Sequence, residues 1–123
     1  MTRSSTKDED KCGTVSVKFP WPRRGRPGEL ELTRVPVSQA WAGAGYGAMF
    51  LPRIGHDVLV EFIGGDPDRP VVTGRVYSAT SPTPYKLPAE RTKSTIKTRS
   101  SSGDLDQQQG FNELMFEDER GSE

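Results

Sequence analysis

The apolar runs in residues 11–77 are short, and most of them alternate with polar residues or end at glycine or proline, which favours strands and turns. Val15, Val17 and Phe19 alternate with polar residues and are closed by Pro20. A period of two places these three apolar side chains on one face of a strand. Four further runs follow: residues 30–37, 48–51, 58–63 and 71–77. Five short strands without a helical period predict an all-β fold, a small closed or nearly closed barrel of five strands. A sandwich is the alternative, but it would need about seven strands.

Composition limits how much of the chain this core can hold. Hydrophobic residues make up 32% of the 123 residues, and 13 glycines and 10 prolines favour turns and extended segments. One modest core is expected. The 17 basic and 17 acidic residues cancel, so no global field favours a polyanion, and no nucleic-acid partner is expected.

Charge and proline divide the chain into four segments. Residues 1–12 are polar and predict a disordered N-terminal tail, whereas residues 13–77 hold the barrel. Residues 78–110 contain three prolines near their start and many serines, which predict an extended connector. Residues 111–123 are acidic and regain apolar side chains.

The terminal segment reads as a single strand over residues 111–116. A lone strand exposes unpaired backbone groups on both edges. We see no partner strand for it in the sequence, and we therefore expect it to be completed by other copies of the chain.

Few residues suggest catalysis or metal binding. Cys12 and His56 are the only cysteine and histidine, which excludes cysteine clusters and a histidine-based triad within one chain. Glu61 lies on an alternating strand and is expected to face solvent or the opposite layer. No enzyme activity and no cofactor are predicted. No run approaches the ~18 apolar residues of a membrane span, and no secretion signal is visible.

Two glycine-rich or acidic stretches are better explained by structure than by ligand binding. The loop Gly43–Gly47 has the spacing GxGxG and no following helix, so it does not match a phosphate loop. Trp41 and Tyr46 at its ends are predicted anchors against the barrel or a neighbouring subunit. The second stretch is a predicted structural turn, formed by Gly65, Asp66, Pro67, Asp68 and Pro70.

One alternative function stays open from the residues alone. Small barrels of this type often bind single-stranded nucleic acid by stacking bases on aromatic side chains beside basic residues. Phe19 and Trp21 stand next to arginines at positions 23, 24 and 26. This alternative is an OB-fold module that binds single strands.

Several long stretches of the chain form a distinctive set: Ser38–Gly55, Val58–Phe62, Gly65–Pro70, Gly74–Tyr77 and Phe111–Leu114. This set resembles VgrG, the spike protein family of type VI secretion, and its relatives at the tips of contractile phage tails. The resemblance implies an OB-fold barrel, an extended connector and the first strand of a trimeric β-helix or β-prism needle.

The resemblance also implies a mechanical function. The chain would link a hub to a membrane-puncturing needle, with copies of itself, hub or baseplate, tail tube proteins and a secreted effector as partners. It would reside in the bacterial cytoplasm before assembly and leave through the contractile apparatus. The residues expected at the trimer or hub interface are Trp41, Tyr46, Phe50, Phe111, Asn112, Leu114 and Phe116.

Overall fold

All regular structure in residues 2–5, 12–20, 33–101 and 110–122, which the computed structural model describes, is β-strand apart from one 3-10 turn, η1 (Ile63–Gly65). The chain divides into two compact units, Met1–Ser81 and Pro82–Glu123. The all-β prediction is therefore confirmed for the described residues.

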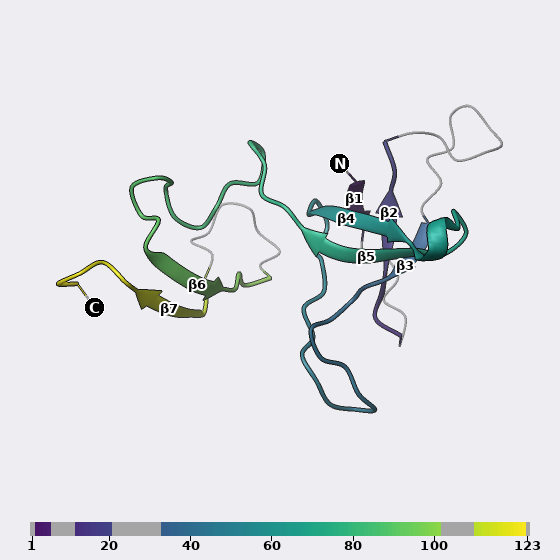
Figure 1. The fold of residues 1–123 in the computed structure, drawn as a ribbon, viewed down its shortest axis with the longest axis horizontal. Coiled ribbons are helices and arrows are strands. Elements are labelled where there is room, and N and C mark those ends of the chain that lie inside the picture. The colour runs from purple at the N-terminus through teal and green to yellow at the C-terminus, as the bar shows by residue number, and fades with distance from the viewer. Residues whose placement is uncertain (1, 6–11, 21–32, 102–109, 123) are drawn as a thin grey trace. The chain divides into compact units, whose positions relative to one another are not determined.

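The first unit is built around one antiparallel sheet (Figure 1). Its strands lie in the order β3-β2-β1-β4-β5. Their bounds are β1 (Thr2–Ser5), β2 (Thr14–Lys18), β3 (Thr33–Pro36), β4 (Asp57–Phe62) and β5 (Pro70–Arg75).

The two edges of this sheet approach each other at one point. Val37 and Val72 form an isolated parallel bridge, and the Ser38 N–H donates to the Val72 carbonyl oxygen at 2.9 Å. Pro36 ends β3, an edge strand, as expected for a residue that cannot donate to a ladder. Full closure of the five strands into a barrel stays a prediction.

The core of the first unit is small and consists mainly of valine. Val15 and Val17 point inward from β2 as their alternation predicts, and Phe19 continues the same face. The Phe19 ring stacks against the ring of Phe62, with 6.3 Å between centroids. The buried hydrophobic side chains among the described residues are Val15, Val17, Phe19, Val35, Val58 and Val72.

Two expectations about the strands are wrong. Residues 2–5, assigned to a disordered tail, form β1, which pairs with β2 on one side and β4 on the other. Backbone hydrogen bonds to two neighbours stabilise this segment, and an apolar pattern in the sequence cannot reveal them. Residues 48–51, counted as a strand, are not one.

The pairing of β4 and β5 is irregular near Gly74. The register of β4 and β5 shifts between Leu59 and Val60, so that Leu59 faces Gly74 while Val60 faces Val72. Thr73 is the extra residue of this bulge, which bends the strand pair.

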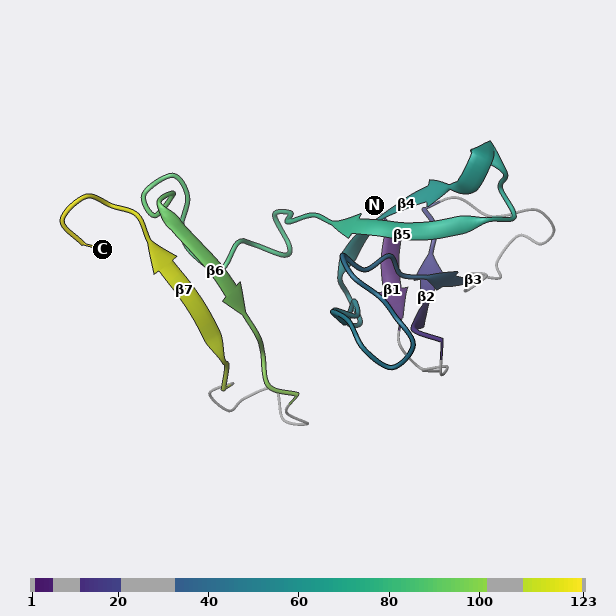
Figure 2. The ribbon, with the colours of Figure 1, turned by 60° about the horizontal axis from the view of Figure 1, so that its bottom comes forward.

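The second unit contains an antiparallel hairpin of β6 (Lys93–Lys97) and β7 (Glu113–Glu117), which Figure 2 shows side by side. The prediction that the terminal strand has no partner in its own chain is therefore wrong. The partner lies within residues 78–110, which were expected to form only a connector. Its sequence, Lys-Ser-Thr-Ile-Lys, contains a single apolar residue, so its period of two is carried by polar side chains.

Candidate assembly site

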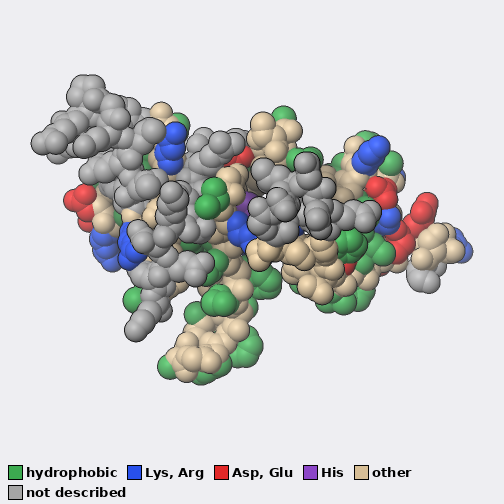
Figure 3. Space-filling view, turned by 180° about the vertical axis from the view of Figure 1, so that it is seen from behind, with side chains coloured by type: hydrophobic (Ala, Val, Ile, Leu, Met, Phe, Trp, Pro, Cys, Tyr) green, Lys and Arg blue, Asp and Glu red, His purple; other side chains and the backbone are tan. Residues whose placement is uncertain are grey.

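A glycine-rich arm, residues 38–51, joins β3 to β4 and carries exposed aromatic side chains. In the space-filling view its visible face bears hydrophobic and uncharged atoms, without a Lys, Arg, Asp or Glu side chain (Figure 3). Trp41 is 61% exposed and Tyr46 is 65% exposed. The structure thus places both predicted anchors on the surface of the first unit, and it brings Phe50, also exposed, to the same arm.

The tip of the arm has a defined geometry. The Gly43 N–H donates to the Tyr46 carbonyl oxygen at 2.8 Å, and the Ala48 N–H donates to the Trp41 carbonyl oxygen at 2.9 Å. The Trp41 and Tyr46 rings meet edge to face, with 5.9 Å between centroids. These contacts fix two large aromatic side chains before any partner binds, which lowers the entropy cost of association.

Two glycines make this tip possible for steric reasons. A Cβ at Gly43 would lie 2.5 Å from the Tyr46 ring, and a Cβ at Gly47 would lie 2.6 Å from the Trp41 carbonyl oxygen. Gly47 also has φ of 135°, which L side chains rarely adopt. The glycines of the arm therefore allow the aromatic rings and the backbone to pack closely at its tip.

We expect Gly47→Ala to disrupt the tip and Gly45→Ala to preserve it. Both residues have positive φ, which costs alanine on the order of 1–3 kcal/mol, but Gly45 has no atom within 4 Å of an added Cβ. Hydrogen exchange of the Ala48 N–H checks this: protection should be lost in Gly47→Ala and largely kept in Gly45→Ala. Equal protection in the two variants would contradict the steric argument.

At the base of the arm, hydrogen bonds from side chains connect the two chain segments, in place of the backbone hydrogen bonds of a strand pair. The Gln39 amide donates to the Phe50 carbonyl oxygen at 3.3 Å and accepts from the Phe50 N–H at 2.9 Å. The Arg75 guanidinium donates to the same carbonyl oxygen. Gln39 and Arg75 thus connect the two chain segments at the base of the arm, and the sequence predicted this role for neither residue. In the sequence, these two residues are marked only as polar side chains next to a segment that has no strand pattern.

The hairpin of the second unit has two faces of opposite character. Strand alternation places Ser94, Ile96, Leu114 and Phe116 on one face, where Ile96 pairs with Leu114 and Ser94 with Phe116. All four are exposed, and Phe116 is 60% exposed. Leu114 and Phe116, two predicted interface residues, therefore belong to an apolar face that is uncovered within the described residues.

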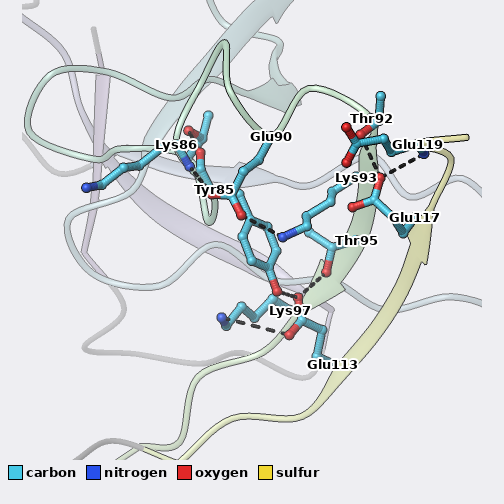
Figure 4. Close-up of polar contacts among 11 residues, drawn as sticks. Tyr85, Lys86, Glu90, Thr92, Lys93, Thr95, Lys97, Glu113, Glu117 and Glu119 are labelled. Atoms are coloured by element: carbon cyan, nitrogen blue, oxygen red, sulfur yellow. Dashed lines mark hydrogen bonds and ion pairs between the residues drawn. The ribbon is translucent and has the colours of Figure 1, made fainter. Parts of the chain in front are cut away.

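The other face is polar and is covered by a side chain of its own unit. The Tyr85 hydroxyl donates to Glu113 Oε1 at 2.7 Å, and the Thr95 hydroxyl donates to the same oxygen at 2.6 Å (Figure 4). Lys93 Nζ and Lys97 Nζ lie 4.5 Å and 5.1 Å from the centre of the Tyr85 ring. Tyr85 was missed as a structural residue because an isolated tyrosine in a proline-rich stretch has no pattern.

Phe111 does not join the apolar face. Lys97 Nζ lies 4.2 Å from the centre of the Phe111 ring, at the polar side of the hairpin. The Asn112 backbone extends the pairing just before β7, because its N–H donates to Thr98 Oγ1 at 2.9 Å and its carbonyl oxygen accepts from the Thr98 N–H at 2.8 Å. The structure thus separates Phe111 from Leu114 and Phe116, and it gives Asn112 a part in the strand pairing.

Hydrogen bonds shift the pKa values of this polar face. The pKa of Glu113 is lowered, first by the hydrogen bond from Thr95 and then by that from Tyr85, with Lys97 and Lys93 adding to the effect. The pKa of Glu117 is lowered by hydrogen bonds from the Thr92 hydroxyl and from the backbone. The pKa of Tyr85 is raised, mainly because its hydroxyl donates to Glu113.

We expect the polar face to be lost at both ends of the pH range. A lowered carboxyl pKa contributes stability above the ordinary glutamate value of about 4.3, and this stability is lost as pH falls through the native pKa. A raised tyrosine pKa contributes stability below about 10, and it is lost as pH rises through the native pKa. NMR signals of Tyr85 and Thr95 should report both transitions. In Glu113→Gln the acid transition at these residues should shrink, and an unchanged one would contradict the assignment.

The residues of the predicted structural turn extend from the end of η1 to the start of β5. In the turn from Ile63 to Arg69, Asp66 Oδ1 accepts from the Asp68 N–H at 2.9 Å, and the Ile63 N–H donates to the Arg69 carbonyl oxygen at 2.9 Å. Gly65 has φ of 73°, and Pro70 is buried at the start of β5.

Phe19, offered for base stacking, is buried in the core with 7% of its surface exposed. A ring in that position cannot stack on a base, so this part of the nucleic-acid hypothesis is wrong. Trp21 and the arginines at 23, 24 and 26 lie outside the described residues.

In the described ranges, no three His, Cys, Asp or Glu side chains lie together as a metal site would require. Across those same residues, no helix has the length and hydropathy needed to span a membrane. The features that stand out are surfaces: the arm and the apolar hairpin face.

Comparison with known proteins finds one matching family and several similar proteins. Residues 4–77 match the family described as the type VI secretion system/phage-baseplate injector OB domain. The type VI secretion system spike protein VgrG3 of Vibrio cholerae is 48% identical over 93% of this chain. The spike protein VgrG1a of Pseudomonas aeruginosa is also 48% identical over 93% of the chain.

A third relative shows that the family includes a protein named as a toxin. It is the actin cross-linking toxin VgrG1 of Vibrio cholerae, again 48% identical over 93% of the chain. The chain covers only 11%, 10% and 17% of the lengths of VgrG3, VgrG1 and VgrG1a.

Proposed function

Because the chain belongs to the family of the type VI secretion system/phage-baseplate injector OB domain, we propose that it is a structural component of a contractile injection spike. In this proposal the first unit is an OB barrel, closed along the Val37–Val72 bridge, and the second unit begins a β-helix or β-prism needle. In this role the chain would act through its mechanical stiffness, and it would catalyse no reaction.

The apolar face of the β6–β7 hairpin carries this proposal. Ile96, Leu114 and Phe116 are more than half exposed, although the polar face of the same hairpin is covered by Tyr85. A soluble hairpin normally has the reverse arrangement. Three copies around an axis would bury the apolar faces against one another, and they would leave the charged faces in water.

Assembly would use the residues already named from the sequence, with distinct parts for the two units. Leu114 and Phe116 would line the axis of a homotrimer, and Phe111 and Asn112 would hold the hairpin in register. Trp41, Tyr46 and Phe50 would contact a neighbouring copy or the hub. The other partners would be the baseplate and tail tube proteins, a secreted effector and, through the needle, the target membrane.

This assignment implies a route through the cell. The chain would wait in the bacterial cytoplasm until assembly, and contraction would then deliver it outward. The names of the relatives, which describe type VI secretion spike proteins, support this route.

A replacement in a relative tests the function. In VgrG1a of Pseudomonas aeruginosa, the 114 aligned residues are replaced by those of this chain, in cells that lack VgrG1a, VgrG1b and VgrG1c. We expect the chimera to restore secretion of the spike into the medium. A matched chimera carrying Leu114→Ser and Phe116→Ser should fail. Accumulation of a folded, unsecreted first chimera would contradict the proposed function.

A further inference from the structure

The first unit carries a second exposed surface, on the outer face of β4 and at the start of η1. Leu59 and Ile63 are 49% and 47% exposed, and Glu61 lies between them, also exposed. The inner face of the same strand, with Val58 buried, belongs to the core. The outer face therefore presents a stripe of apolar, acidic and apolar side chains, here called the β4 stripe (Leu59, Glu61 and Ile63).

Gly74 leaves the β4 stripe open on one side. It pairs with Leu59 across the strands and has no side chain to cover it, and the Leu59 Cδ1 lies 3.5 Å from the place of an added Cβ. The carboxylate of Glu61 has no ion-pair partner among the residues the structure describes. The stripe is thus an exposed apolar platform with one unmatched negative charge.

The arm and its flanks have the opposite charge. Residues 33–56 contain Arg34 and Arg53 but no acidic residue, whereas residues 57–68 contain four acidic residues and no basic one. Arg75 donates to the Phe50 carbonyl oxygen, so its guanidinium is held at the base of the arm. The arm therefore offers aromatic rings with positive charge at their base.

Side chains on a threefold axis meet their own copies, but each contact away from the axis joins two different surfaces. Such off-axis contacts are heterologous, with one patch of a chain meeting another patch of its neighbour. The arm and the β4 stripe differ in shape and charge, and both are exposed in the chain that carries them. Aromatic anchors of this kind supply most of the binding energy of an interface, and complementary charges at the rim set its register.

We propose that the arm of one chain docks on the β4 stripe of a second copy. Trp41 and Tyr46 pack against Leu59 and Ile63, and the Arg75 guanidinium at the base of the arm faces Glu61. The inference rests on the proposed trimeric spike, because it specifies which surfaces the neighbouring copies share.

Cross-linking of two single-cysteine variants of the full chain tests this contact. Both variants carry Cys12→Ser, one with Ala44→Cys at the tip of the arm and the other with Ile63→Cys on the β4 stripe. At high chain concentration under mild oxidation, we expect a disulfide-linked dimer in the mixture and little in either variant alone. Absence of the mixed dimer, or equal dimer in the separate solutions, would overturn the inference.

Charge variants test the register of the contact. Glu61→Arg in the Ile63→Cys chain should slow mixed cross-linking by roughly tenfold at low salt, because it places like charges together. Glu119→Arg changes an exposed carboxylate of the second unit and should leave the rate unchanged. Equal slowing by both variants would show general charge attraction and would overturn the specific contact.

The cross-linking test of the arm contact and the replacement test of the proposed function can fail independently of each other. Leu114→Ser with Phe116→Ser removes the apolar hairpin face but leaves both first-unit surfaces intact, so mixed cross-linking should persist in that background. If the replacement in VgrG1a restores secretion but mixed cross-linking is absent, only the arm contact is wrong. If cross-linking is present but secretion fails, only the proposed function is wrong.

Discussion

Phe19→Ala is expected to destabilise the first unit severely, with its urea midpoint shifted far below that of the unsubstituted chain. Phe19 is 7% exposed and stacks on Phe62, so truncation leaves a cavity that this small core cannot fill. The cost of such a change is about 3–5 kcal/mol. A unit of about 80 residues has a total stability of roughly 4–12 kcal/mol. The substitution therefore removes a large share of the stability.

Phe50→Ala is the matched control. It makes the same chemical change at a ring that is 55% exposed, and the bonds of Phe50 to Gln39 and Arg75 come from its backbone. Urea unfolding of the two variants should show a large loss for Phe19→Ala and less than about 1 kcal/mol for Phe50→Ala. Similar losses would contradict the placement of the core.

Leu114→Ser with Phe116→Ser is expected to abolish trimer formation in a chain extended beyond Glu123 with the VgrG1a residues that follow the aligned segment. Burial of one phenylalanine side chain stabilises by about 2 kcal/mol. Three copies of Phe116 around an axis therefore contribute about 6 kcal/mol, or roughly four orders of magnitude in the association constant. Leu114 adds to this effect.

Met115→Ser is the control for that experiment. Met115 lies on β7 between the two substituted residues, but it points to the polar face opposite them and is 43% exposed. Sedimentation at a series of concentrations should show monomer for the double variant and trimer for Met115→Ser. Dissociation by both variants to the same extent would show that the choice of face is wrong.

The sequence predicts the inward face of the sheet well. Val15, Val17 and Phe19 form the expected apolar face, because in a half-buried strand hydrophobic burial and the period of two coincide. Pro36 at the sheet edge and the bulge at Gly74 were also predictable, since each follows from a local property of the backbone.

The sequence does not predict strands that are held by backbone pairing alone. β1 consists of threonine, arginine and serine, and β6 has Ile96 as its single apolar residue. Neither strand has an alternating apolar face that would identify it in the sequence. Both are held by backbone pairing with strands farther along the chain. For the same reason the terminal strand was assigned no partner in its own chain.

The assembly surfaces were predicted only as residue types. Trp41 and Tyr46 were identified as anchors, but their exposure and fixed geometry depend on Gly43 and Gly47, whose steric role appears only in three dimensions. Leu114 and Phe116 were expected to need neighbouring copies because of unpaired backbone. The structure replaces that reason with an exposed apolar face.

Sedimentation equilibrium of the extended chain without further substitutions tests the central claim most directly, because it measures how many chains the hairpin face brings together. The account predicts the mass of three chains, with the NMR signals of Leu114 and Phe116 protected from solvent. A single chain whose β6–β7 hairpin is folded, with Leu114 and Phe116 still exposed to water, would contradict it.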